Sequence, residues 1–247
     1  MDSLSSTELP RGNRLLDSLP PAERAGLAPH VESVHLEIKE PLFEQGKRLE
    51  RVYFPLTAVA SMINLLAGTA GVEVATVGNE GMIGVPVSWG VTTLNPRELI
   101  QVQVPGEALV LDVDTFLAKI PQPGELTERV NLYTQALFAQ VSQQVACNGL
   151  HSVEERCARW LLLTHDRVRT DEFPLTQEFL AHMLGVRRAS VTAVSGVFQK
   201  AGFIRFRRGW MRITDRHGLE STACECYGVV REVFDRLLGA GGLSYVR

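Results

Sequence analysis

Cysteine and long apolar runs are both scarce in this sequence. Four of the 247 residues are cysteine, too few for a small disulfide-stabilised scaffold, so we expect a reducing compartment, the cytoplasm. No stretch approaches the roughly 18 consecutive apolar residues of a membrane helix, and the first residues lack the basic and apolar regions of a secretory signal. We therefore expect neither a membrane partner nor export.

Signatures of common enzymes are also missing. The sequence contains no Gly-x-Ser-x-Gly, no phosphate-binding P-loop and no His-Glu-x-x-His, so we expect no catalytic residues and a protein that is not an enzyme. The composition is that of a globular protein, with 45% hydrophobic and 21% charged residues. The length suits two domains, or one domain with an appendage.

Charge is distributed unevenly along the chain. Residues 174–217 carry eight basic and two acidic residues, a net charge of +6, whereas the whole chain carries −3. A local basic surface on an acidic protein is what neutralisation of DNA phosphates requires. The alternative is that these arginines only form a solvated face.

Residues 176–204 predict two helices joined by a glycine turn. Thr176 can cap the first helix, Gly185 permits the tight turn, and the second helix is expected from residue 187 to about 201. The expected packing face of the second helix is Val191, Val194 and Phe198, and the residues off that face are Ser190, Thr192, Ser195 and Gln199. Arginines at the start of a helix, followed by small polar residues, fit a helix end placed in the major groove of DNA.

A basic hairpin is predicted directly after the second helix. The apolar segments 203–206 and 210–213 flank Arg207, Arg208 and Gly209, and Gly209 favours a hairpin turn. A hairpin with arginines at its tip, next to a recognition helix, is a wing. The residues that we expect to contact DNA are Gln177, Arg187, Arg188, Ser190, Thr192, Lys200, Arg207 and Arg208.

The first half of the chain has a strand pattern. Short alternating segments with glycine and proline between them predict an antiparallel sandwich or barrel, with strands near residues 34–38, 52–54, 58–66, 72–77, 98–104 and 108–113. Residues 78–84 contain three glycines, whose backbone amides could approach a ligand closely. Gly78, Glu80, Gly81 and Met82 are therefore candidates for effector binding, although glycines at a barrel corner are more often structural.

A long amphipathic helix of roughly 35 Å is predicted from residue 124 to about 148, with Gly149 ending it. Its apolar seam consists of Leu126, Val130, Tyr133, Leu137, Val141 and Val145. Such a seam suits a parallel dimer. The alternative is that the seam packs against the barrel of the same chain.

Cys224 and Cys226, near His217, raise the question of metal binding or redox sensing. We expect both cysteines on one last helix that begins near residues 216–219. Sulfurs two positions apart on a helix point about 200° away from each other, which makes a poor chelate. We therefore expect no metal site, and we interpret both cysteines as small core residues.

These features together resemble the CRP/FNR-type transcription regulators, the family of the cyclic-AMP receptor protein and the fumarate–nitrate reduction regulator. The resemblance spans residues 15 to 238. Residues 42–46 (LFEQG) and 52–54 (VYF) resemble the family's first barrel strands, residues 176–192 its helix-turn-helix, and residues 202–204 the start of its wing. The helix-turn-helix segment is the more specific match.

The resemblance implies an α+β chain with three parts. These are an antiparallel jelly-roll domain of the cyclic-nucleotide-binding type at residues 1–123, a dimerisation helix at 124–150, and a winged helix-turn-helix domain at 151–247. It also implies a homodimer that binds a near-palindromic operator in double-stranded DNA, with half-sites about one helical turn (~34 Å) apart. RNA polymerase and an unknown small-molecule effector are left open as further partners.

The sequence departs from the family at both of its binding sites. The family's receptor protein has Arg-Glu-Thr-Val-x-Arg in its recognition helix, whereas here Arg188 is followed by Ala189 and later by Ala193, so the operator sequence does not carry over. The family's cyclic-nucleotide site contains an Arg-Ser/Thr-Ala element, and the nearest match is Arg97 followed by Glu98. Because the Glu98 carboxylate would repel a phosphate, we keep Arg97 as a candidate effector residue but do not expect cyclic AMP.

An iron–sulfur cluster of the family's usual type is not expected, because residues 1–146 contain no cysteine. The main hypothesis is a DNA-binding transcription regulator. The alternative is a small-molecule or redox sensing module with little DNA affinity of its own.

Overall fold

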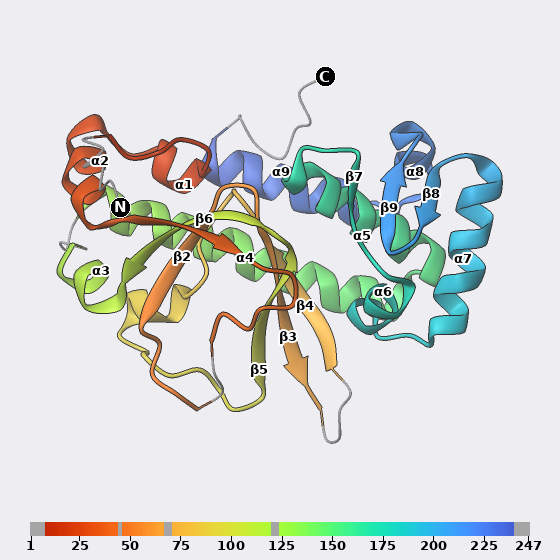
Figure 1. Cartoon of the computed structure of the whole chain (residues 1–247), viewed down its shortest axis with the longest axis horizontal. Coiled ribbons are helices and arrows are strands. Elements are labelled where there is room, and N and C mark those ends of the chain that lie inside the picture. Colours follow the sequence, from red (N-terminus) through yellow and green to blue (C-terminus); the bar gives the residue numbers. More distant parts are fainter. Residues whose placement is uncertain (1–7, 44–45, 67–70, 120–123, 240–247) are drawn as a thin grey trace.

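The computed structural model describes residues 8–43, 46–66, 71–119 and 124–239. Figure 1 shows an antiparallel β-structure at one end, a long helix (α4) that runs across the molecule, and a helical region with a small sheet at the other end. The fold is α+β with an antiparallel barrel and a winged helix-turn-helix, as the sequence predicts. Among the described helices, none combines the length and the apolar character needed to cross a bilayer.

The elements of the N-terminal region are α1 (Arg14–Asp17), α2 (Pro21–Leu27), the 3-10 helix η1 (Ala28–His30), β1 (Glu32–Leu36), β2 (Arg51–Pro55), β3 (Val59–Leu65), β4 (Gly71–Val77), the 3-10 helix η2 (Val85–Trp89), β5 (Glu98–Val104), β6 (Gly106–Asp112) and α3 (Val113–Lys119). The remaining elements are α4 (Glu125–Leu150), α5 (Val153–Val168), β7 (Glu172–Pro174), α6 (Gln177–Leu184), α7 (Arg188–Ala201), β8 (Ile204–Arg207), β9 (Trp210–Ile213), α8 (Arg216–Thr222) and α9 (Cys226–Leu238).

The barrel consists of two antiparallel three-stranded sheets, with strand orders β1-β6-β2 and β4-β3-β5. Apolar side chains on alternate positions, such as Phe54, Val59 and Leu109, are almost completely buried between the sheets. The predicted first strand is shorter than expected. It ends at Leu36, and Ile38 is 42% exposed in a turn where the Glu37 N–H donates to the Glu40 carboxylate (2.8 Å).

The apolar seam predicted for dimerisation is the inner face of α4. Leu126, Val130, Tyr133 and Leu137 are buried within the chain's own fold, where α4 packs against β4, η2, α1 and α9. The alternative of packing on the same chain is therefore correct for this part of the seam. The last residue of the predicted seam, Val145, is not covered and is 70% accessible. Together with Phe138, which lies seven residues earlier and is 72% accessible, it forms an exposed apolar stripe on α4.

The C-terminal end of α4 also differs from the prediction. The helix continues through Gly149 to Leu150, and His151 is its C-cap, with its backbone N–H donating to the Cys147 carbonyl (3.1 Å). A glycine in the last turn of a helix weakens it without ending it. This extension places His151 one turn after Cys147.

The single last helix expected after the wing consists of two helices. α8 ends at Thr222 and α9 begins at Cys226, and Ala223 between them has extended backbone angles. Cys224 therefore lies in the break and Cys226 in the first turn of α9. The assumption that both sulfurs project from one continuous helix was wrong, and so was the geometric argument against chelation that rested on it.

A few predicted features lie outside the described residues. These are positions 44–45 of the segment 42–46, residue 123 at the predicted end of the barrel domain, and the two ends of the chain, residues 1–7 and 240–247.

Candidate DNA interface

α6 and α7 form the helix-turn-helix that the sequence predicts. The Phe179 N–H donates to Thr176 Oγ1 (3.1 Å), which caps the start of α6. Gly185 ends α6 with a φ of +64°, a left-handed conformation that favours glycine. A Cβ atom at Gly185 would also lie 3.1 Å from the Val72 side chain, so this turn packs against strand β4 of the barrel.

Helix α7 lies at the edge of the molecule, away from the barrel (Figure 1). Val191 and Phe198 are buried, as predicted. Ser195 was expected off the packing face but is fully buried. Positions 191, 195 and 198 are four and three residues apart, which places them on one helical face.

Of the residues predicted to reach DNA bases, Arg188 and Thr192 are four positions apart and lie on the same exposed face of α7, whereas Ser190 lies on another face. Arg187, at the N-cap position, and Arg188, the first helical residue, are exposed, as is Thr192, whereas Ser190 is half-buried. The Thr192 hydroxyl donates to Gln177 Oε1 (2.8 Å). This bond connects the first turn of α6 to the second turn of α7, so Gln177 and Thr192 are held as a pair.

The predicted wing is the hairpin of β8 and β9. Its two turn residues, Arg208 and Gly209, have φ values of +50° and +83°. Positive φ at both central residues is typical of the type I′ turn that matches the twist of a two-residue hairpin. The turn projects Arg207 and Arg208 into solvent, and Trp210, paired with Arg207 across the hairpin, is 49% exposed.

We use the name basic surface for the six exposed cations of α7 and the wing, which are Arg187, Arg188, Lys200, Arg205, Arg207 and Arg208. Within the described part of the chain, none of these six has a carboxylate partner. The nearby Arg212 and Arg216 differ, because they pair with Glu172 and Asp166. The sequence-based set omitted Arg205 and Trp210, although the alternation of the strand pattern already placed Arg205 on the exposed side.

The domain that carries this surface is fixed to the barrel through α5. The Arg167 guanidinium donates to the Glu80 carboxylate (2.8 and 3.0 Å), and both side chains are completely buried. Arg167 also donates to the Gln140 side chain of α4 (3.3 Å). One buried ion pair thus joins the loop after β4, the long helix α4 and the first helix of the DNA-binding region.

A second buried polar contact joins β4 to α5. The Glu73 carboxylate accepts hydrogen bonds from Trp160 Nε1 (2.8 Å) and from the Ser61 hydroxyl (2.6 Å). Burial raises the pKa of Glu73 to about 7. The side chain therefore carries a proton over much of the acidic range, unlike an ordinary surface glutamate.

The glycine-rich segment, expected to face an effector, packs inside the molecule. A Cβ atom at Gly81 would lie 1.9 Å from the Tyr133 ring, and one at Gly78 would lie 2.7 Å from the Arg167 side chain. Glu80 is buried against Arg167. Gly78, Glu80 and Gly81 therefore pack inside the fold, in agreement with the alternative interpretation that the glycines of this segment are structural. The expectation that these three residues face a ligand is corrected accordingly.

A partly open cavity of about 250 Å³ lies between the β4-β3-β5 sheet, η2 and α4. Its lining is mainly apolar and includes Met82, Leu137 and Val141. Among the described lining residues Glu98 is the only charged one, and Arg97 is exposed outside the cavity. Of the five candidate effector residues, only Met82 lines this cavity. None of the described lining residues is a cation that could pair with a cyclic phosphate.

Comparisons with known proteins agree with this geometry. The family model of the Crp-like helix-turn-helix domain matches residues 155–222. None of the curated proteins compared with the sequence matches it significantly. Among solved structures, a CRP/FNR-family transcriptional regulator from Eubacterium rectale is similar over 84% of this chain and 96% of its own, with 17% identity and a TM-score of 0.64.

Two further structures are similar in the same way. A CRP-family transcriptional regulator from Thermus thermophilus has 19% identity over 77% of this chain and 96% of its own, with a TM-score of 0.63. FixK2 from Bradyrhizobium japonicum has 15% identity over 78% of this chain and 98% of its own, with a TM-score of 0.61. At these identities the likeness establishes the fold. Residues 155–222 therefore match the Crp-like helix-turn-helix domain, in a chain with the overall fold of the CRP/FNR-type transcription regulators.

Proposed function

We propose that the protein is a homodimeric transcription regulator that reads a near-palindromic DNA site through α7. The observation that carries this proposal is the basic surface, whose six cations are exposed and lack carboxylate partners among the described residues, in a chain of net charge −3. Unpaired arginines on a protein surface are available to phosphates and base edges. The similarity of residues 155–222 to Crp-like domains supports the same function.

The position of each residue suggests its role. Arg188, at the start of α7, is placed to pair with a guanine in the major groove, with Thr192 one turn further along the same face. Ser190, on another face of the same turn, would reach a base or a nearby phosphate. Arg187, Lys200, Arg207 and Arg208 would contact phosphates. Gln177 would position Thr192 through their hydrogen bond and add a contact at the start of α6.

The exposed stripe of α4 is the proposed dimer contact. Phe138 and Val145 are large, apolar and mostly solvent-accessible, and their seven-residue spacing matches one position of a heptad. A second copy of the chain would cover this stripe and set the two α7 helices about one helical turn (~34 Å) apart. We expect Phe138→Glu to convert the dimer to a monomer in sedimentation experiments, whereas Leu117→Glu, at another exposed apolar residue, on α3, leaves the dimer intact.

The decisive experiment is selection of bound sites from random duplex DNA by the purified full-length protein, with and without cyclic AMP. The expected result is enrichment of two related half-sites in opposite orientation, unchanged by cyclic AMP. Fluorescence anisotropy on the selected site then gives the affinity across a salt series. No enrichment, together with no binding at low salt, would contradict the proposal.

The cavity favours a second candidate function, a small-molecule sensing module with little DNA affinity. Its apolar lining suits a small apolar effector, and its position next to α4 suits a sensor. A thermal-shift screen of small apolar molecules tests this function directly. A large shift in a protein that fails the DNA selection would favour the second candidate.

RNA polymerase remains a predicted partner, and the cytoplasm remains the predicted location.

A further inference from the structure

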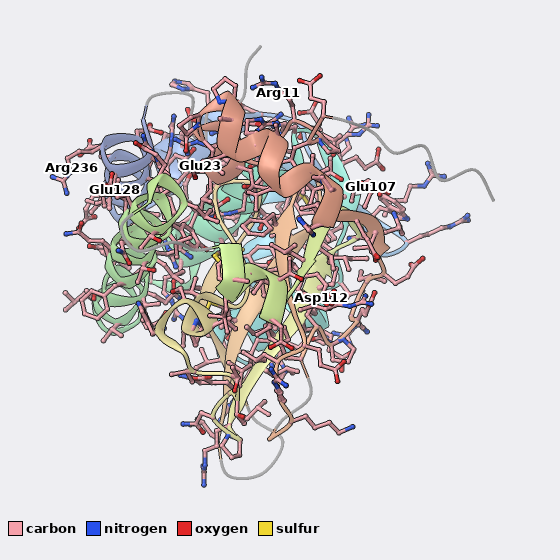
Figure 2. All side chains as sticks on the ribbon, turned by 90° about the vertical axis from the view of Figure 1, so that its left-hand side faces the viewer. Arg11, Glu23, Glu107, Asp112, Glu128 and Arg236 are labelled. Carbon is pink, nitrogen blue, oxygen red and sulfur yellow. The ribbon has the colours of Figure 1, made fainter. Side chains whose placement is uncertain are left out.

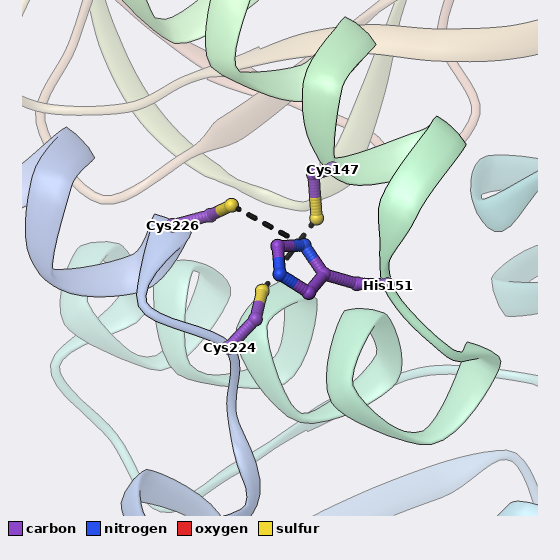
Figure 3. Close-up of side chains that lie close together, drawn as sticks. All are labelled: Cys147, His151, Cys224 and Cys226. Atoms are coloured by element: carbon purple, nitrogen blue, oxygen red, sulfur yellow. Dashed lines mark hydrogen bonds between the residues drawn. The ribbon is translucent and has the colours of Figure 1, made fainter.

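Four side chains converge at the corner between α4 and α9 (Figure 3). They are Cys147 in the last turn of α4, His151 at its C-cap, Cys224 in the break after α8, and Cys226 at the start of α9. The Cys147 and Cys224 sulfurs are 3.6 Å apart, and the Cys226 sulfur lies 3.5 Å from His151 Nδ1. One ligand atom from each of the four residues lies within 4.8 Å of the other three.

We propose that Cys147, His151, Cys224 and Cys226 form a tetrahedral Cys₃His site for a single divalent metal ion, with zinc as the expected occupant. In zinc sites the bonds to sulfur are about 2.3 Å and those to histidine nitrogen about 2.0–2.1 Å, so the edges of a regular tetrahedron are about 3.8 Å between sulfurs and about 3.6 Å between sulfur and nitrogen. The two measured distances are close to these edges.

Local backbone structure explains why the four residues meet. Cys147 and His151 are four positions apart, and the His151 N–H still bonds to the Cys147 carbonyl, so both side chains leave the same side of α4. Cys224 and Cys226 follow the extended residue Ala223, outside a continuous helix, which lets both sulfurs turn toward α4. All three cysteines are buried, as structural zinc ligands usually are.

Neighbouring groups orient the ligands. The other ring nitrogen of the histidine, His151 Nε2, lies 3.2 Å from the Glu225 carboxylate. A carboxylate on one nitrogen of a metal-binding histidine fixes the ring and leaves the other nitrogen free to bind the metal. In addition, Gln143 Nε2 donates to the Cys226 sulfur (3.0 Å).

The charge around the cluster also suits bound thiolates. Three thiolates and one divalent ion sum to a charge of −1. Arg156 and Arg159 on α5 are buried, and neither has a carboxylate partner among the described residues, with the Nε–H of each left unpaired. The positive charges of these two arginines would therefore offset the net negative charge of the thiolates.

The fourth cysteine provides a matched control. Cys157 is completely buried on α5 without belonging to the cluster, and burial raises the pKa of its thiol to about 12. A serine at position 157 therefore reports any general cost of losing a buried thiol, without removing a metal ligand.

The test measures metal content of the full-length protein, purified under reducing conditions and exchanged into metal-free buffer after loading with zinc. We expect about one zinc per wild-type chain and per Cys157→Ser chain, and at least a tenfold loss for Cys224→Ser and for His151→Asn. Cobalt loading of the wild type should give the visible bands of a tetrahedral thiolate site. Chelation of zinc should lower the Tm of the wild type by about 5 °C or more, with little effect on His151→Asn.

His151→Asn guards against a folding artefact, because this side chain is 16% exposed, whereas the three cysteines of the cluster are at most 5% exposed. A wild-type chain that binds no zinc or cobalt would overturn the proposal, as would a Cys224→Ser chain that retains full zinc. Iron with inorganic sulfide in place of a single ion would also overturn it. The metal measurement does not involve DNA, so its failure is distinguishable from failure of the proposed regulator function.

Discussion

Two groups of arginines are used in opposite ways in this molecule. On α5, Arg167 and Arg159 are almost completely inaccessible, and Arg167 is held by the Glu80 carboxylate. On α7 and the wing, the arginines of the basic surface are exposed and have no carboxylate partner in the described part of the chain. The far end of the molecule differs from both, because acidic and basic side chains are mixed there, as with Glu107, Asp112 and Arg11 in Figure 2.

The difference shows that position decides what an arginine contributes. A guanidinium is weakly hydrated and has five donors, so it can be buried against carboxylates and carbonyl groups and becomes part of the fold. When exposed and unpaired, the same group adds little to stability. Its donors are then available to an external anion.

The largest expected effect is the loss of a buried arginine. Arg167→Met leaves the Glu80 carboxylate buried without its partner, so we expect a loss of about 3–5 kcal/mol in the free energy of unfolding, measured with urea. The same substitution at exposed Arg188 should change stability by less than about 0.5 kcal/mol. Adding Glu80→Leu to Arg167→Met should recover part of the lost stability. Equal destabilisation by Arg167→Met and Arg188→Met would contradict the comparison between buried and exposed arginines.

Next in size is the effect of Glu73, a buried carboxylate that forms no ion pair with an arginine of the described residues. Its pKa in the folded chain is about 7, against an ordinary value of 4.5, so between these pH values the folded chain keeps a proton that the unfolded chain releases. Stability from this group therefore falls as pH rises through that window. We expect Glu73→Gln to be more stable than the wild type by up to about 3 kcal/mol near pH 8 and no more stable near pH 4.

The matched control for Glu73 is Glu128→Gln, at an exposed carboxylate of α4. The two variants are compared by urea unfolding over a pH series. A Glu73→Gln variant whose advantage over the wild type does not change with pH would show that Glu73 ionises normally in the folded chain.

For the exposed group, we expect Arg188→Ala to weaken binding to the selected DNA site by about 1–3 kcal/mol, because a bidentate contact to a base is lost. Random DNA should be affected much less. Anisotropy titrations with both DNAs give the ratio of the affinities for selected and random DNA. An equal loss of affinity for both DNAs would mean that Arg188 contacts the DNA backbone and not a base.

The smallest expected effect is that of a single phosphate contact. Arg207→Gln should weaken selected and random DNA alike and reduce the slope of log affinity against log salt by about one. Arg11→Gln, at an exposed arginine of the far end, serves as the control and should leave the slope unchanged. A slope unaffected by Arg207→Gln would remove the wing from the DNA contact.

The helix-turn-helix and the wing could be predicted because their signals are local. Thr176, Gly185 and Gly209 each fix a cap or a turn within a few residues, and the structure has them as expected. Which face of α4 is covered could not be predicted in this way. The apolar positions of α4 serve both the barrel and an outer stripe, and only the positions of β4 and α9 show that Leu137 is inside and Phe138 outside.

The cysteine cluster was missed for a related reason. Cys147 and Cys224 are 77 positions apart, so their proximity depends on how α9 packs along α4. The break between α8 and α9 contains neither glycine nor proline, the usual signals for a helix end. A search for the paired spacings Cys-x₃-His and Cys-x-Cys would have brought the four residues together.

One turn of α4 connects the cavity with the exposed apolar stripe. Leu137 and Val141 form part of the cavity wall, while Phe138, the residue that follows Leu137 in the chain, is exposed to solvent. A molecule held in the cavity and a partner chain seated on Phe138 would press on the same few peptide units from opposite sides. Any coupling between the two would be reciprocal, so a factor by which the occupant changes the affinity of dimer formation is also the factor by which dimer formation changes the affinity of the occupant.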